Sequence, residues 1–217
     1  MGQSKHHPPC VQFAAVFSSE PGLLDACWTQ LESLWGPIAD LSTAWDFVES
    51  EYYHATMGRG LKKQLAVFRD PYDPAQLWEH KLLGNRLERE LPESSGFHGD
   101  GKGKNGACKG EPGTPQPALG RALRPINIDP GFLSLTKLVL ASTKNREHRI
   151  YLREGIYAEV TLAFRDQAWQ TMPWTYSDYQ RADVRDFLAA ARRRFAASIA
   201  VRSPAPGRIR NEGEPHV

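Results

Sequence analysis

Apolar positions follow two different periods along the chain, and the change of period predicts the order of the elements. Residues 11–18 are almost continuously apolar, which indicates a buried strand. Apolar side chains then recur every three or four positions over residues 24–35, which predicts a helix that begins near Pro21. Residues 38–47 and 61–68 have the composition of two further strands. The chain therefore begins β-α-β-β.

A second helix and a group of late strands follow. Asp73 with Pro74 and Gln76 has the pattern of a capped helix start, and this helix should extend to about residue 91. Four strands are predicted afterwards, at residues 123–129, 136–143, 148–152 and 156–164. Ser177 and Gln180 resemble a capping box that opens a last helix, whose apolar face comprises Val184, Phe187, Leu188, Ala191, Phe195 and Ile199.

This element order predicts an α+β fold. Its first six elements match the ferredoxin-like β-α-β-β-α-β arrangement, and the later strands would extend the antiparallel sheet before a C-terminal helix. We expect a single domain over residues 11–200. Residues 93–120 are rich in Gly, Pro, Lys and Ser and should form a flexible insertion, while residues 1–10 and 201–217 should be disordered.

Composition narrows the class of protein. The 217 residues carry 27 basic and 25 acidic side chains, and a net charge of +2 does not indicate nucleic acid or membrane as a partner. No window reaches the roughly 18 apolar residues that span a bilayer. The N-terminus lacks a hydrophobic signal core, and the 3 cysteines are odd in number. We therefore expect a cytoplasmic protein without a disulfide framework.

Alternation along the late strands brings polar side chains to one face of the predicted sheet. Carboxylates there can act as general bases or metal ligands, and arginine can hold an oxyanion. An equally simple interpretation is a sheet face in contact with water. The candidate catalytic residues are Asp129, Glu159 and His148; the candidate ligand-binding residues are Asn127, Lys144, Arg149, Tyr151, Tyr157 and Thr161.

Four local patterns each leave an alternative open. The cationic turn at residues 143–149 suits an anion but also a solvated hairpin. Asp129 precedes Pro130-Gly131, which predicts a tight turn at a strand end, where Asp129 would either bond to turn amides or join Asn127 in holding a metal or positioning water. Lys81, Asn85 and Glu88 share one helix face, which we expect to be solvated. Three aromatic residues should pack at the start of the last helix or form a wall for a planar ligand: Trp174, Tyr176 and Tyr179.

An ordered series of motifs resembles a bacterial and archaeal family, domain of unknown function 4416. The motifs are Tyr52-Tyr53, Met57-Gly58, Lys81, Asn85, Glu88, Asn127 to Gly131, Lys137 to Ala141, His148 to Leu152, Gly155 to Leu162, Trp174 to Tyr176 and Asp178-Tyr179. The resemblance implies kinship rather than a reaction. Thr56 stands where a glutamate is expected, and the insertion is longer than expected.

The resemblance also raises GTP binding, a label that some relatives carry, but the sequence contains no Gly-x-x-x-x-Gly-Lys-Ser/Thr loop. We expect the protein to bind a small anionic ligand, a phosphorylated metabolite or nucleotide, with hydrolytic or phosphoryl chemistry as an open extension. The alternative is a non-catalytic module that binds RNA or a protein through the sheet face and Arg192-Arg193-Arg194. The sequence indicates no particular cofactor, metal or oligomeric state.

Overall fold

Nine strands form one antiparallel sheet in the part of the chain that the computed structural model describes, residues 3, 5–48, 57–94 and 124–202. The order across the sheet is β2-β4-β1-β5-β6-β8-β7, with β3 paired to β4 and β9 to β8. The bounds are β1 Cys10–Ser18, β2 Ile38–Leu41, β3 Trp45–Asp46, β4 Lys62–Pro71, β5 Ile126–Ser134, β6 Lys137–Ser142, β7 Ile150–Arg153, β8 Ile156–Arg165 and β9 Ala168–Thr171.

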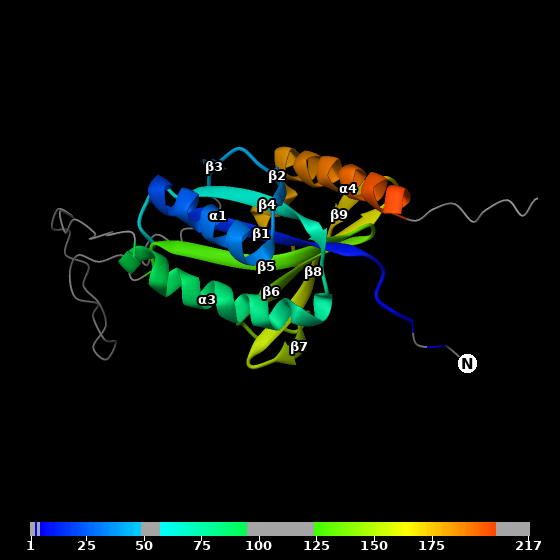
Figure 1. Ribbon diagram of the computed structural model, residues 1–217, viewed down its shortest axis with the longest axis horizontal. Coiled ribbons are helices and arrows are strands. Elements are labelled where there is room, and N and C mark those ends of the chain that lie inside the picture. Colours follow the sequence, from blue (N-terminus) through cyan, green and yellow to red (C-terminus); the bar gives the residue numbers. More distant parts are fainter. Residues whose placement is uncertain (1–2, 4, 49–56, 95–123, 203–217) are drawn as a thin grey trace, which may run out of the picture.

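Helices cover both faces of the sheet. Helix α1 (Pro21–Trp35) and helix α3 (Leu77–Ser94), which follows a 3-10 turn η2 (Pro74–Gln76), lie side by side across the front of the sheet in Figure 1. Helix α4 (Ala182–Arg202) follows the 3-10 turn η3 (Ser177–Gln180) and packs on the opposite face. Of the described helices, none is long and apolar enough to cross a membrane.

Alternation in β1 explains why the sheet carries helices on both sides. Ala14 and Val16 pack against α1 and α3, whereas Phe13 and Ala15 point into the cluster that contains α4. All nine residues of β1 are buried, because β4 and β5 flank it in the sheet. The predicted class, helices combined with an antiparallel sheet, is therefore confirmed, and α4 buries the apolar face expected of it.

The predicted turn at Asp129-Pro130-Gly131 is wrong, because β5 continues through these residues to Ser134. The backbone of Ile128 bonds to side chains of α3 rather than to β1, so that edge of β5 faces away from β1. Pro130 lies two positions later, so the backbone nitrogen that carries no hydrogen faces the same edge. Pairing with β6 begins only at Gly131, so the proline removes no ladder bond.

Other element boundaries also differ. Residues 38–47 divide into β2 and β3, β7 begins two residues later than expected, and β9 was not predicted. The expected capping box does not form. Instead Ser177 starts the turn η3, the Gln180 amide donates to the Thr175 carbonyl, and α4 begins at Ala182. The predicted insertion at residues 93–120 and the tail at 201–217 lie almost entirely outside the described residues.

Candidate functional site

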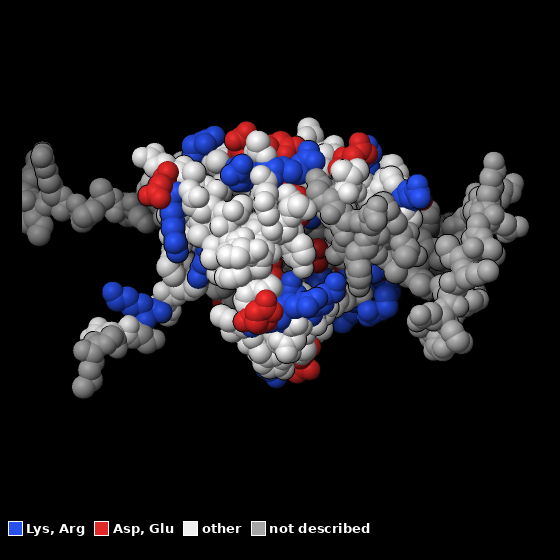
Figure 2. Space-filling view, turned by 180° about the vertical axis from the view of Figure 1, so that it is seen from behind, with Lys and Arg blue, Asp and Glu red and all other residues white. Residues whose placement is uncertain are grey.

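A cavity of about 530 Å³ lies where β5 and β6 diverge. The two strands pair only between Gly131–Leu133 and Leu138–Leu140, so the earlier half of β5 has no strand partner on that side. The face seen from behind in Figure 2 is hollowed near its centre, with Lys and Arg at the rim and acidic side chains deeper inside. Its walls come from β4, β5, β6, β8, α3 and the segment around η3.

Two side chains of α3 take the place of the missing strand. Lys81 donates from Nζ to the carbonyl oxygen of Ile128 at 2.7 Å, and Glu88 Oε1 accepts from the Ile128 N–H at 2.8 Å. Their side chains are only 4% and 6% exposed, which contradicts the expected solvated stripe. An unpaired strand edge in the interior needs hydrogen-bond partners, and a helix that crosses this edge can supply them.

Asp129 belongs to the same network. Its Oδ1 accepts from Lys81 Nζ at 3.0 Å and its Oδ2 from Asn127 Nδ2 at 2.8 Å. Arg124 extends the network by bonding to Glu88 and to Asn127 Oδ1. Burial alone would raise the pKa of Asp129, but Lys81, Lys63 and Arg124 together hold it below its ordinary value. The carboxylate therefore stays ionised at neutral pH.

Arg149 joins three parts of the cavity wall. Its Nε donates to Glu159 Oε2 at 2.7 Å, its Nη1 to Ser142 Oγ at 2.7 Å and its Nη2 to the Tyr176 hydroxyl at 2.9 Å. Burial alone would lower the pKa of Arg149, but Glu159 and Tyr176 hold it above its ordinary value. Since Nη1 also donates to the Lys144 carbonyl at 2.9 Å, Arg149 fixes the turn that follows β6.

His148 and Thr161 lie behind Glu159, and neither lines the cavity. The imidazole Nε2 is 3.2 Å from Glu159 Oε2, and its ring stacks on Trp174 with centroids 4.9 Å apart. Thr161 is fully buried and its hydroxyl donates to Glu159 Oε1 at 3.3 Å. Both therefore orient the Glu159 carboxylate that Arg149 binds.

Five of the nine predicted site residues line the cavity together: Asn127, Asp129, Lys144, Arg149 and Glu159. Tyr151 and Tyr157 do not. They form an edge-to-face pair between β7 and β8, with ring centroids 5.4 Å apart, and Tyr151 is 58% exposed. These tyrosines share the strand alternation of Glu159, but Tyr151 lies on β7, the last strand of the sheet, and Tyr157 pairs with it from β8, away from the gap at β5.

Sequence reasoning missed a buried ion pair in the opposite wall. Lys63 of β4 pairs with Asp178 of η3, and its Nζ lies 4.8 to 5.4 Å from the ring centroids of Phe17, Phe47 and Tyr179. The sequence did contain an indication of this pair, because Lys63 shares its strand face with Leu65 and Val67, which are core residues. A lysine at a core-facing strand position needs a carboxylate partner.

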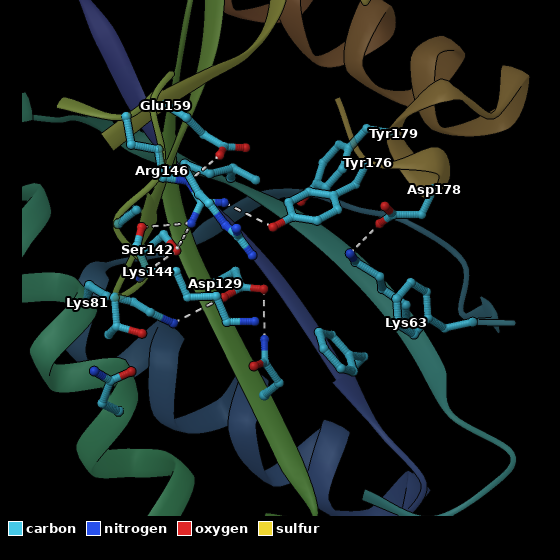
Figure 3. Close-up of a pocket in the computed structure, with 18 of the residues that line it drawn as sticks. Lys63, Lys81, Asp129, Ser142, Lys144, Arg146, Glu159, Tyr176, Asp178 and Tyr179 are labelled. Carbon is cyan, nitrogen blue, oxygen red and sulfur yellow. Dashed lines mark hydrogen bonds and ion pairs between the residues drawn. The ribbon is translucent and has the colours of Figure 1, made fainter. Parts of the chain in front are cut away.

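Figure 3 shows Lys81 and Asp129 on one side of the cavity and Tyr176, Tyr179 and Asp178 on the other. The family comparison matches residues 8–96 and 116–195, so it includes every residue that lines this cavity. The chain belongs to the domain of unknown function family DUF4416. The resemblance seen in the motifs is thereby confirmed. Neither a curated protein nor a solved structure matches the chain.

The cavity of this DUF4416 protein is rich in positive charge. Among the described residues that line it, six are Lys or Arg, namely Lys63, Lys81, Arg124, Lys144, Arg146 and Arg149, and three are acidic, namely Asp129, Glu159 and Asp178. Each of the three carboxylates bonds to one of these cations. No group of three or more His, Cys, Asp or Glu that could hold a metal ion occurs in the described part of the chain.

Lys81→Met should raise the pKa of Asp129 in this DUF4416 protein, because it removes the strongest nearby positive charge. In the wild type, the depressed pKa makes the ionised carboxylate stabilise the fold above about pH 4. This contribution is lost as the pH falls through the folded-state pKa. Urea unfolding at a series of acidic pH values should therefore show a shallower loss of stability for Lys81→Met than for the wild type.

Lys62→Met is the matched control, since Lys62 pairs with Asp46 on the surface, where the two side chains are 42% and 67% exposed. The stability of Lys62→Met should fall with acidic pH as steeply as that of the wild type. Equally steep losses for Lys81→Met and Lys62→Met would contradict the role assigned to Lys81.

Proposed function

We propose that the cavity binds a small anionic ligand that carries a phosphate group. The observation that carries the proposal is the excess of lining cations over carboxylates around a cavity of about 530 Å³. Arg149, Lys63 and Lys81 have side chains only 3 to 4% exposed, so their charges act in a medium of low effective dielectric. An anion that enters would gain more from these charges than it would in water.

The turn after β6 supplies the groups that suit a phosphate best. Lys144 and Arg146 are exposed and line the cavity, and so does Thr143, which directly precedes Lys144 in sequence. Most N–H groups of Arg149 bond within the protein, so we assign it the positioning of this turn rather than the main contact with the anion. Lysine and arginine bind phosphate oxygens through short, charge-assisted hydrogen bonds.

The same geometry favours binding over general base catalysis. Asp129 has a lowered pKa, so it is a weak base at neutral pH. Glu159 is 2% exposed, and it accepts from Arg149. His148 contacts Glu159 but does not line the cavity. Hydrolytic or phosphoryl chemistry by these three residues would require them to leave their present partners.

The terminal helix gives less support to an RNA-binding role. Arg192 donates from Nε to the Leu135 carbonyl at 2.7 Å and lies 3.5 Å from the centroid of the Phe164 ring. Arg194 pairs with Asp40. Two of the three consecutive arginines therefore contact other residues of the same chain, which favours a small ligand over RNA. GTP stays within the proposed ligand class, although the sequence lacks a P-loop.

We also propose a ferredoxin-like arrangement for the part from β1 to β5 and a cytoplasmic location. The spatial order β2-β4-β1-β5, antiparallel throughout, supports the first proposal, since the two helices α1 and α3 pack on one face of these strands. The odd number of cysteines supports the second.

A thermal-shift screen of the purified protein against inorganic phosphate, sugar phosphates and nucleotides tests the binding proposal. A ligand at one hundred times its dissociation constant should stabilise the fold by about 2.7 kcal/mol. The double variant Lys144→Ala/Arg146→Ala should bind at least about tenfold more weakly, because charged hydrogen bonds contribute about 1.5–3 kcal/mol each.

Arg86→Ala is the control, because Arg86 is an exposed cation of α3 that does not line the cavity. It should bind as the wild type does. The proposal fails if no phosphorylated compound shifts the melting temperature, or if Arg86→Ala and the double variant lose the same affinity.

A further inference from the structure

The cavity offers an incoming ligand one carboxylate. Asp129 is 29% exposed, whereas Glu159 and Asp178 are only 2% and 4% exposed. An ionised carboxylate has about four acceptor sites. The described residues use two of them on Asp129, one for Lys81 and one for Asn127. A partly exposed, ionised acceptor in a cavity with excess positive charge repels a phosphate at that point and attracts a hydrogen-bond donor.

A hydroxyl group in the opposite wall also lacks a partner. The Tyr179 side chain is 2% exposed, and its buried hydroxyl has no hydrogen-bond partner among the described residues. Burial, together with Asp178 and Asp129, raises the pKa of Tyr179 well above its ordinary value, so the hydroxyl keeps its proton and can donate. A buried polar group without a partner is costly, and a ligand that accepts its hydrogen bond would remove that cost.

We propose that the ligand is a phosphorylated polyol, whose hydroxyl groups bind Asp129 and Tyr179 while its phosphate binds Lys144 and Arg146. This inference rests on the proposed function and names the ligand class. Hydroxyl groups both donate and accept, so they match an acceptor on one wall and a donor on the other. A free sugar phosphate and the ribose phosphate of a nucleotide both have this chemistry.

Titration calorimetry with two phosphate monoesters tests the inference. Ribose 5-phosphate and n-butyl phosphate carry the same charged group, but the second compound has no hydroxyl. The wild type should bind ribose 5-phosphate at least about tenfold more tightly, because a hydrogen bond to a charged partner contributes about 1.5–3 kcal/mol. Equal affinities in the wild type would overturn the inference but leave anion binding intact. Binding of neither compound would overturn both proposals.

Two variants assign the discrimination to the named groups. Asp129→Asn should bring the affinity ratio close to one by weakening ribose 5-phosphate, while n-butyl phosphate binds as well or better because a negative charge is gone. Tyr179→Phe removes a hydroxyl that bonds to nothing in the described protein, so it should leave the melting temperature nearly unchanged. Its affinity for ribose 5-phosphate should fall about 2- to 10-fold. An unchanged ratio in both variants would refute the assignment.

A second pair of ligands distinguishes a free sugar phosphate from a nucleotide. Guanosine 5′-monophosphate should bind more tightly than ribose 5-phosphate if the physiological ligand is a nucleotide, since Tyr176, a residue that is 50% exposed, lines the cavity and offers an aromatic ring for stacking. Equal or weaker binding of the nucleotide identifies a sugar phosphate.

Discussion

Replacing Asp178 by alanine should lower the free energy of unfolding by about 3–5 kcal/mol, because it leaves the Lys63 ammonium buried without its carboxylate. Both side chains are only 4% exposed, so the pair is largely shielded from bulk water. The aromatic rings around Lys63 attract the ammonium, but each such contact contributes about 0.5–2 kcal/mol and existed before the substitution. Urea unfolding at neutral pH measures the loss.

Asp183→Ala is the matched control. Asp183 lies five residues further along and pairs with Arg181, but these side chains are 58% and 33% exposed. An exposed pair contributes at most about 1 kcal/mol. The double variant Lys63→Met/Asp178→Leu should recover most of the lost stability, since it removes both charges from the interior. Similar losses for Asp178→Ala and Asp183→Ala would show that the buried pair has no special role.

Gly131→Ala should be the second strongly destabilising substitution, with a loss of about 3 kcal/mol or more, at or above the usual range for overpacking. A Cβ at residue 131 would lie 2.3 Å from the Val139 carbonyl oxygen and 2.8 Å from Leu140 Cδ2. The first of these atoms is backbone, so β5 and β6 would have to separate where their pairing begins. The melting temperature and the affinity for phosphate ligands should fall together, because Leu140, which the added Cβ would displace, lines the cavity.

Gly22→Ala is the control, because it makes the same glycine-to-alanine substitution where a Cβ has room. Residue 22 lies in the first turn of α1, and no other atom lies within 4 Å of a Cβ built there. The substitution should leave stability unchanged or raise it by up to about 1 kcal/mol, since alanine has the higher helix propensity. A loss at Gly131 no larger than the change at Gly22 would show that β5 and β6 separate without cost.

Hydrophobic periodicity predicted those elements of the fold whose burial follows the regular period of a strand or a helix. The apolar run of β1 and the helical spacing of α1 and α4 each reflect burial on a known period. β1 and α1 lie where the sequence placed them, and α4 buries the predicted apolar face although it begins at Ala182 rather than at the expected capping box. The continuation of β5 through Pro130 was not predictable in the same way. A proline is compatible with a strand only if its missing N–H faces an unpaired edge, and that edge depends on where β6 ends its pairing.

The candidate site likewise contains residues that local patterns predicted and residues that they did not. Alternation correctly placed Asn127, Asp129 and Glu159 on one face of the sheet, and the structure brings them to one cavity. Lys81 was expected in water because residues at positions i, i+4 and i+7 on a polar helix face usually are. Its burial depends on a gap between two strands that are distant from α3 in sequence, and local patterns carry no information about that gap.

The central position of β1 has a consequence for the order in which the protein folds. Its pairing with β4 joins Ser18 to Lys62, whereas its pairing with β5 joins Cys10 to Ser134. Closing the longer loop costs more chain entropy, and contacts between distant residues slow folding. During synthesis the segment through α3 emerges first and can already pair β1 with β4. Lys63 and Lys81 are then present before the strands that carry Asp129 and Glu159, so the cavity is completed only in the last stage of folding.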